Sequence, residues 1–225
     1  MYFKITNSQE NHNGFQYVDG LNILIEKFNE NPDHSCCTGG FYFTDITNIF
    51  KFLNYGVFLR EIKLPIDNPK FKMIKDKEND KWRTNLIILG KRYDLFTVNT
   101  FKYLIKNGAN IHADDDYVFR YCAQNGHIAI MDWFKNSGFE YKYDERAINH
   151  ASQYGHIAVL DWFKNSYFEF KYDKWTINYA SLNGHIAVLD WFKNSGFKFK
   201  YDESAINYAS LNGHVTVLDW FKNSG

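Results

Sequence analysis

The chain has 225 residues, with 26 Lys plus Arg against 26 Asp plus Glu, so its formal charge at pH 7 is zero. Hydrophobic residues make up 45% and aromatic residues 19%, which excludes a disordered chain, while the balanced charge argues against nucleic-acid binding. No apolar run is long enough to span a membrane. The three cysteines, two of them adjacent, fit reduced thiols better than a disulfide framework. We therefore expect a soluble, intracellular protein that binds neither nucleic acid nor a membrane.

Residues 1–85 contain no internal repeat, and their short apolar segments predict a small α+β domain. The predicted elements are, in chain order, a turn at 19–20, a helix over 21–28, a strand over 41–44, a helix over 46–53 and a strand over 57–65. The charge run over 76–81 predicts a solvated loop at the domain boundary.

Two adjacent cysteines in this domain, Cys36 and Cys37, precede the glycine pair at 39–40, and His34 lies two residues upstream. A thiol beside a glycine-rich loop and a histidine is compatible with a nucleophile. No base stands at an informative spacing, so we favour a structural use of both thiols. We keep a thiol-dependent enzyme in this domain as an alternative, and otherwise expect no catalytic residue, cofactor or metal.

A tandem repeat fills the rest of the chain. The segment Gly126-His127-Ile128-Ala129-Ile130 returns in closely similar form at 155–159, 184–188 and 213–217, a step of 29 residues each time. Between 173–196 and 202–225, 19 of 24 positions are identical. The predicted repeat region is therefore 86–225, divided into a degenerate unit at 86–114, units at 115–143, 144–172 and 173–201, and a truncated unit at 202–225.

Each unit is predicted to be a pair of helices. Asp144 is a suitable N-cap for a first helix that reaches Ser152, and Tyr154-Gly155 breaks that helix. A second helix over 156–165 has one apolar face, and an extended connector leads to the next aspartate. Because one such pair cannot bury its apolar face alone, neighbouring units must stack.

These residues resemble an ankyrin repeat. The Gly-His start of the second helix, the closing Lys-Asn-Ser-Gly and the segment Lys106-Asn107-Gly108-Ala109-Asn110-Ile111 carry the likeness. The units are shorter than the usual repeat of about 33 residues, and they have Ala147-Ile148-Asn149-His150 in place of Thr-Pro-Leu-His. The resemblance implies an all-α solenoid whose connectors form shortened fingers.

With the segments 11–22, 39–44 and 59–65 included, the whole chain resembles the ankyrin repeat proteins of mimivirus-type giant viruses. That resemblance implies a viral protein in the host cytoplasm that acts by binding a host or viral protein, and it implies no enzymatic activity.

The candidate binding positions are those that vary among otherwise copied units. They are Tyr117, Arg146, Trp175 and Ser204, with Asp116, Glu145, Lys174 and Glu203 beside them. Arginine and aromatic side chains at such positions are typical of binding hot spots. We expect them on the concave face formed by the first helices and the connectors.

Three further columns repeat with the units and have structural interpretations. The histidines at 127, 156, 185 and 214 are expected to bond to the turn at the start of their own second helix. Stacked units lie about 10 Å apart, too far for neighbouring histidines to share a zinc ion. The tryptophans at 133, 162, 191 and 220 are expected in the core, and the aspartates at 132, 161, 190 and 219 on a solvated face.

The leading function is a non-enzymatic protein-interaction module with an unidentified protein partner. One alternative is an adaptor whose N-terminal domain recruits host machinery of the ubiquitin-ligase type, since Leu64-Pro65-Ile66-Asp67 resembles the opening of an F-box. Another is a decayed duplicate without function. We expect a monomer that can associate through its last unit, where Ile206, Val217, Leu218 and Phe221 have no following repeat to cover them.

Overall fold

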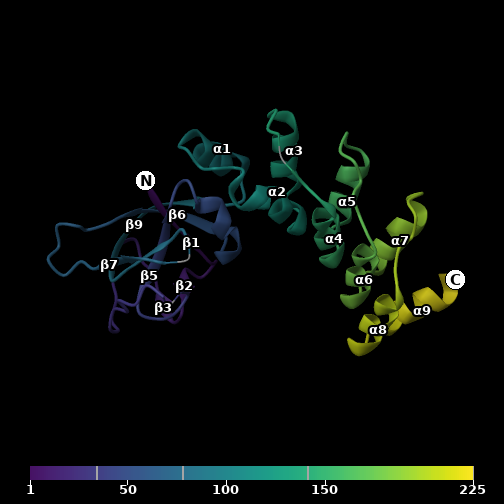
Figure 1. Ribbon diagram of the computed structural model, residues 1–225, viewed down its shortest axis with the longest axis horizontal. Helices are drawn as coiled ribbons and strands as arrows, with labels where there is room; N and C mark the ends of the chain where they lie inside the picture. Colours follow the sequence, from purple (N-terminus) through teal and green to yellow (C-terminus); the bar gives the residue numbers. More distant parts are fainter. Residues whose placement is uncertain (34, 78, 141, 225) are drawn as a thin grey trace. The chain divides into compact units, whose positions relative to one another are not determined.

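The computed structural model describes residues 1–33, 35–77, 79–140 and 142–224, and it divides into two compact units, Met1–Asp114 and Asp115–Gly225 (Figure 1). The first unit is built around a β-sheet and the second contains only helices among its described residues. The architecture is therefore a β-rich N-terminal region followed by a helical C-terminal part, which is consistent with an ankyrin-like domain.

The first unit contains a seven-stranded sheet in the order β4-β9-β6-β1-β5-β8-β7, in which all neighbours are antiparallel. Its strands are β1 (Tyr2–Thr6), β4 (Gly20–Ile23), β5 (Phe41–Asp45), β6 (Phe58–Lys63), β7 (Met73–Lys75), β8 (Trp82–Thr84) and β9 (Leu86–Asp94). A separate hairpin joins β2 (Asn11–His12) to β3 (Phe15–Gln16). The 3₁₀ segment η1 (Ile49–Tyr55) and helix α1 (Val98–Lys106) complete the unit.

The sheet core is aromatic. Phe41, Phe43 and Ile87 are almost fully buried, and Tyr17 packs against Phe41 with ring centroids 5.6 Å apart. Strand β1 is central and buried along most of its length, so even Lys4, between Phe3 and Ile5, is only 5% exposed. Alternation of apolar residues therefore does not describe this strand.

Two predicted strands are confirmed, as β5 and β6, whereas the predicted helix over 21–28 is wrong. Residues Gly20–Ile23 form the edge strand β4, which pairs with β9. Its buried member is Asn22, whose side-chain amide bonds to Val18 and Gly20, while Leu21 and Ile23 are exposed. The expected helix over 46–53 is replaced by η1, in which Phe52 has non-helical backbone angles.

The boundary expected after residue 85 is corrected to residue 114. Strand β9 begins at Leu86 and lies between β4 and β6, so the segment 86–114 supplies a strand and a single helix to the first unit and no helical pair. The charge run over 76–81 joins β7 to β8, and its ends, Asp76 and Lys81, are buried and form an ion pair at 3.8 Å. It is not a boundary loop; Glu78 lies outside the described residues.

The second unit stacks helical pairs (Figure 1). First helices are α2 (Ala113–Gln124, which begins at the end of the first unit), α4 (Glu145–Gln153), α6 (Trp175–Leu182) and α8 (Glu203–Leu211). Second helices are α3 (Ile128–Asn136), α5 (Ile157–Lys164), α7 (Ile186–Asn194) and α9 (Val215–Ser224). The predicted helix over 156–165 is confirmed as α5, with Val159, Leu160 and Phe163 buried. The described parts of the connectors contain no strand; Tyr141 lies outside the described residues.

Candidate interaction surface

The first helices α4, α6 and α8 pack side by side, and a chain of buried amides links them. The amide of Asn149 donates to Asp173 Oδ1 at 2.9 Å, and the amide of Asn178 donates to Asp202 Oδ1 at 2.7 Å. Each of these aspartates also accepts a backbone N–H of the helix that follows it, at Trp175 and Ser204. Asp173 and Asp202 therefore bond both to the preceding first helix and to the start of their own helix. These bonds fix the position of the first turns of α6 and α8 relative to the unit before.

Those next residues include the predicted binding positions. Arg146 is exposed at the start of α4, Trp175 and Ser204 are half-buried at the same place in α6 and α8, and Tyr117 is half-buried in α2. Their neighbours Glu145, Lys174 and Glu203 are exposed. Asp116 is different, because it is only 3% exposed and its carboxylate accepts the backbone N–H of Lys142. We therefore remove Asp116 from the candidate surface.

A second row of half-buried side chains lies one helical turn further along each first helix. These are Tyr121, His150, Tyr179 and Tyr208. The rings of Trp175 and Tyr179 stack with centroids 5.3 Å apart, and those of Tyr117 and Tyr121 lie 5.6 Å apart. This row is not among the predicted binding positions, although its spacing of four residues from each variable position places it on the same helix face. We define the first-helix surface as both rows together with Glu145, Lys174 and Glu203.

Ion pairs orient the charged members of the first-helix surface. Arg146 pairs with the N-cap carboxylate of Asp144 at 2.6 Å, and Lys174 pairs with Asp202 at 2.6 Å. Burial alone would raise the pKa of Asp144, but hydrogen bonds from Arg146 outweigh it and lower that pKa. Both basic side chains remain half exposed, so they are accessible to a partner.

The second helices are joined by a different ladder. The indole N–H groups of Trp162, Trp191 and Trp220 donate to Asp132, Asp161 and Asp190 of the preceding unit, each at 2.7 Å. The lysine three residues after each of these aspartates lies over the same tryptophan ring, with Nζ 5.5–5.8 Å from the centroid. The tryptophans are half-buried rather than core residues, because their indole nitrogens need these acceptors. The aspartate column is thus a structural contact between units.

The histidine column also links neighbouring units. His214 Nε2 lies 3.0 Å from the carbonyl oxygen of Leu182, and His156 bonds to the backbone of Gln124, in both cases the end of the preceding first helix. The expected bond to the histidine's own turn is therefore wrong, and no side-chain cap forms at His156 or His185. The described residues contain no group of three His, Cys, Asp or Glu side chains able to hold a metal ion.

The last unit exposes side chains that inner units cover. Ile206 is 43% exposed, whereas Ile148 and Ile177, at the same place in earlier units, are fully buried. Leu218 and Phe221 are half-buried, but Val217 is fully buried, contrary to expectation, because α8 and α9 pack against each other.

The thiols of the first unit lie beside cations. Cys36 Sγ accepts a hydrogen bond from Lys81 at 2.8 Å, and Cys37 Sγ accepts one from Arg83 at 2.9 Å. Burial would raise the pKa of Cys36, but bonds from Lys81, Tyr55 and Ser35 outweigh burial and lower it. His34 lies outside the described residues. Lys81 at this distance stabilises the thiolate of Cys36 without supplying a neutral base.

Comparison with known proteins identifies the relatives of the chain. No family model matches it. A protein of Acanthamoeba polyphaga mimivirus named as an ankyrin repeat protein is 46% identical over 131 residues, which is 58% of this chain and 64% of that relative. An uncharacterized protein of the same virus is 44% identical over 131 residues, 58% of this chain and 94% of its own length.

A third mimivirus protein, also named as an ankyrin repeat protein, is 44% identical over 140 residues, 62% of this chain and 42% of that relative. The chain thus spans less than two thirds of the length of the first and third relatives. In the described residues, none of the helices is long and apolar enough to cross a membrane. The stacked helical pairs and these relatives together show that the chain belongs to the mimivirus-type family of ankyrin repeat proteins.

Proposed function

We propose that this protein is a non-enzymatic protein-interaction module that binds a host or viral protein through its first-helix surface. The observation that supports the proposal most directly is the contrast within one repeat. The positions that link units, Asn149 and Asn178, carry the same residue type and are buried. The equivalent variable positions, Arg146, Trp175 and Ser204, carry different residue types and remain accessible. A surface that varies on a constant scaffold suits recognition of a specific partner.

The chemistry of the first-helix surface favours a partner that carries apolar side chains together with charged groups of both signs, because Arg146 and Lys174 lie beside Glu145 and Glu203. Trp175, Tyr179 and Tyr208 offer aromatic area at low conformational cost, while Arg146 and Lys174 keep half-exposed charges. Tryptophan, tyrosine and arginine are the residues that most often dominate binding energy. Loss of one such anchor typically costs about 2 kcal/mol, which is roughly 30-fold in affinity.

The test is capture of partners from infected host cells with the full chain, followed by affinity measurement. The variant Trp175→Ala should weaken binding about 30-fold, and Arg146→Glu should weaken it as well. The matched control is Ala158→Glu, an exposed position on the second helix α5, which should bind like the unmodified protein. Equal affinities of Trp175→Ala, Arg146→Glu and the control for the partner would refute binding through the first-helix surface.

One observation favours the adaptor as a second candidate function. Val18, Leu21, Ile23 and Ile25 are 56%, 47%, 56% and 92% exposed along the edge strand β4 and its flanks. The backbone N–H and C=O groups of an edge strand are a template for pairing with a strand of another protein, and exposed apolar side chains beside them add contact area. Ile25→Asp should then remove one captured protein and leave the partner of the first-helix surface in place. If Ile25→Asp captures the same set of proteins as the unmodified chain, the adaptor hypothesis loses its support.

The segment 64–67, which resembles an F-box opening, contains no helix and adds no support to the adaptor hypothesis.

A further inference from the structure

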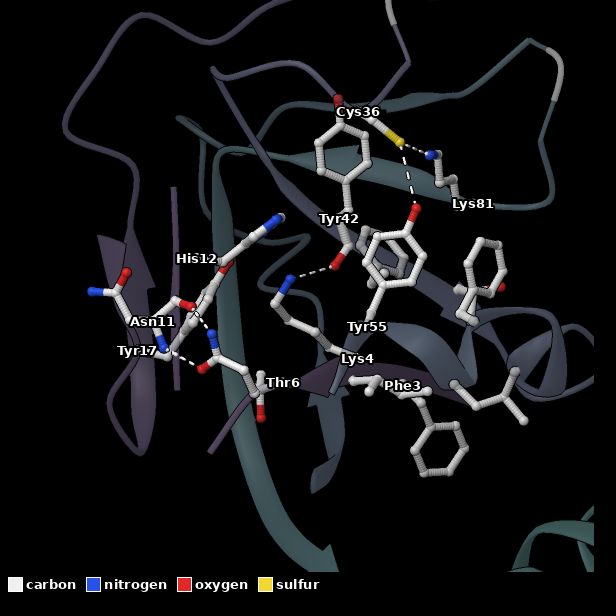
Figure 2. A pocket seen from close by; sticks show the side chains of 16 residues that line it. Phe3, Lys4, Thr6, Asn11, His12, Tyr17, Cys36, Tyr42, Tyr55 and Lys81 are labelled. Carbon is white, nitrogen blue, oxygen red and sulfur yellow. Dashed lines mark hydrogen bonds between the residues drawn. The ribbon is translucent and has the colours of Figure 1, made fainter. Parts of the chain in front are cut away.

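A cavity of about 130 Å³ lies in the first unit beside β1 (Figure 2). Its surface is mostly apolar and includes the aromatic rings of Phe3, Tyr17, Phe43, Phe52 and Tyr55. An apolar protein cavity of about 150 Å³ can hold a benzene molecule. The space is therefore large enough for the apolar body of a small molecule with one ring or a short alkyl chain.

The wall of this cavity contains two lysines and no carboxylate. Lys4 and Lys81 line it, the lining residues include no aspartate or glutamate, and the Cys36 thiol that also lines it is hydrogen-bonded to Lys81. The phenols of Tyr42 and Tyr55 also line it, and the pKa of each is raised to about 12. The main cause is burial for Tyr42 and the hydrogen bond with Cys36 for Tyr55. Both phenols therefore stay protonated at neutral pH. Such a wall favours an occupant that is negatively charged and accepts hydrogen bonds.

Lys4 is the group that such an occupant would neutralise. It is only 5% exposed, its Nζ donates to the backbone oxygen of Tyr42 at 2.9 Å, and it lies 4.8 Å from the centroid of the Tyr17 ring. Among the described residues no carboxylate pairs with it. Burial accordingly lowers the pKa of Lys4 to about 7.

Neighbouring buried cations show the contrast. Arg60 faces Lys4 across the β1–β6 pair and is 2% exposed, but it has both Glu10 and Asp19 as partners. Lys81, also buried, has Asp76 and the thiol of Cys36. Lys4 differs from Arg60 and Lys81 because it has no carboxylate partner and lies beside a cavity that could hold a carboxylate. A buried ammonium group without an anion is costly, so an anion bound there would stabilise it.

We propose that the cavity binds a small apolar monocarboxylate, with its carboxylate paired to Lys4 Nζ and its apolar body packed among the aromatic rings. The anion stabilises the ammonium form of Lys4, so binding takes up a proton at pH values above neutrality. The occupant is a free small molecule, because the volume leaves no room for a protein segment.

Benzoate is the probe, measured by calorimetric titration of the full chain in buffers of different ionisation enthalpy. We expect saturable binding with a dissociation constant of about 1 mM or tighter, proton uptake near pH 8, and an affinity that falls about tenfold for each pH unit above 7. Benzyl alcohol, a neutral analogue, should bind at least about tenfold more weakly. No binding of benzoate, or binding independent of pH, would overturn the proposal.

The variant Lys4→Met should lose benzoate binding while its melting temperature stays equal or rises, since an apolar residue of similar length replaces an unpaired buried charge. Lys75→Met, at an exposed lysine of β7 outside the cavity, is the matched control and should bind benzoate normally. Equal binding by both variants would show an apolar cavity that does not use Lys4. If Lys4→Met does not fold, the pH profile of the unmodified protein decides the question alone.

Discussion

The ladder between second helices gives a prediction that contains its own control. Asp161 accepts the indole N–H of Trp191 at 2.7 Å. Asp219 has the same place in α9, and among the described residues no indole donates to it. Both aspartates are exposed and occupy the same helical position. Asp161→Ala and Asp219→Ala therefore change helix propensity equally, and only Asp161→Ala removes a contact between units.

The difference between these variants follows from the geometry. A hydrogen bond to a charged group contributes about 1.5–3 kcal/mol when it is shielded from water, and solvent screening at an exposed carboxylate reduces this value. We expect Asp161→Ala to lower the free energy of unfolding by about 1 kcal/mol more than Asp219→Ala does. Trp191→Phe should abolish that difference in a double-mutant cycle, because the indole N–H is the donor.

Urea denaturation followed by circular dichroism measures the free energies, and hydrogen exchange locates the change. Because repeat arrays approximate sums of nearest-neighbour terms, Asp161→Ala should reduce amide protection in α5 and α7 before it affects the sheet unit. Equal free energies of unfolding for Asp161→Ala and Asp219→Ala would refute the structural role of the ladder.

Three further predictions follow from particular contacts. Gly155→Ala should destabilise the fold by about 2 kcal/mol more than Gly213→Ala. Both glycines have positive φ, but of the two only Gly155 would place a Cβ 2.9 Å from the imidazole of the next unit. Thermal melting compares the two variants, and equal losses of stability would contradict this contact. Burial lowers the pKa of His156, so the unfolded state binds more protons and stability should fall as pH drops below about 6.5; His156→Gln should flatten that dependence in melting curves from pH 7.5 to 5. Cys36, which is exposed and has a lowered pKa, should react with iodoacetamide at pH 7 faster than Cys122, which is buried and whose pKa burial raises. Equal rates by mass spectrometry would contradict these two environments.

The helical pairs could be predicted from sequence because local rules and the fold agree in them. Asp144 is a residue type favoured at the N-cap, and it caps α4. Gly155 follows the end of α4 with positive φ. In α5, Val159, Leu160 and Phe163 are buried, as the helical period requires. Every unit repeats these rules, so an error in one unit would conflict with the others.

The sheet unit was harder to predict because its strand pairs are non-local. The apolar pattern does not indicate β4 as a strand, since its two apolar side chains face solvent and its buried residue is Asn22. β9 looked like part of a degenerate repeat, because nothing within 86–94 reveals that its partners are β4 and β6. Burial of Lys4 in the central strand likewise depends on contacts with Tyr17 and Tyr42 that sequence spacing does not show.

The contacts between units were also beyond sequence reasoning, although their residues were all visible as columns. The sequence predicts the tryptophan column in the core and the aspartate column on a solvated face, as two separate features. The structure joins them across a step of 30 residues, one more than the sequence repeat. A helix side chain covers the turn before its own Cα, so a search one residue beyond the period could have paired them.

The central claim is that the first-helix surface binds a protein, and the most direct measurement is hydrogen exchange of the full chain with and without its captured partner. We expect added protection to concentrate on the exposed starts of α4, α6 and α8. At a partner concentration that saturates the unmodified protein, Trp175→Ala should show less of this protection, in line with its about 30-fold weaker binding, while Ala158→Glu keeps it. Protection confined to the second helices or to the sheet unit, with Trp175→Ala binding as tightly as the unmodified protein, would contradict the claim.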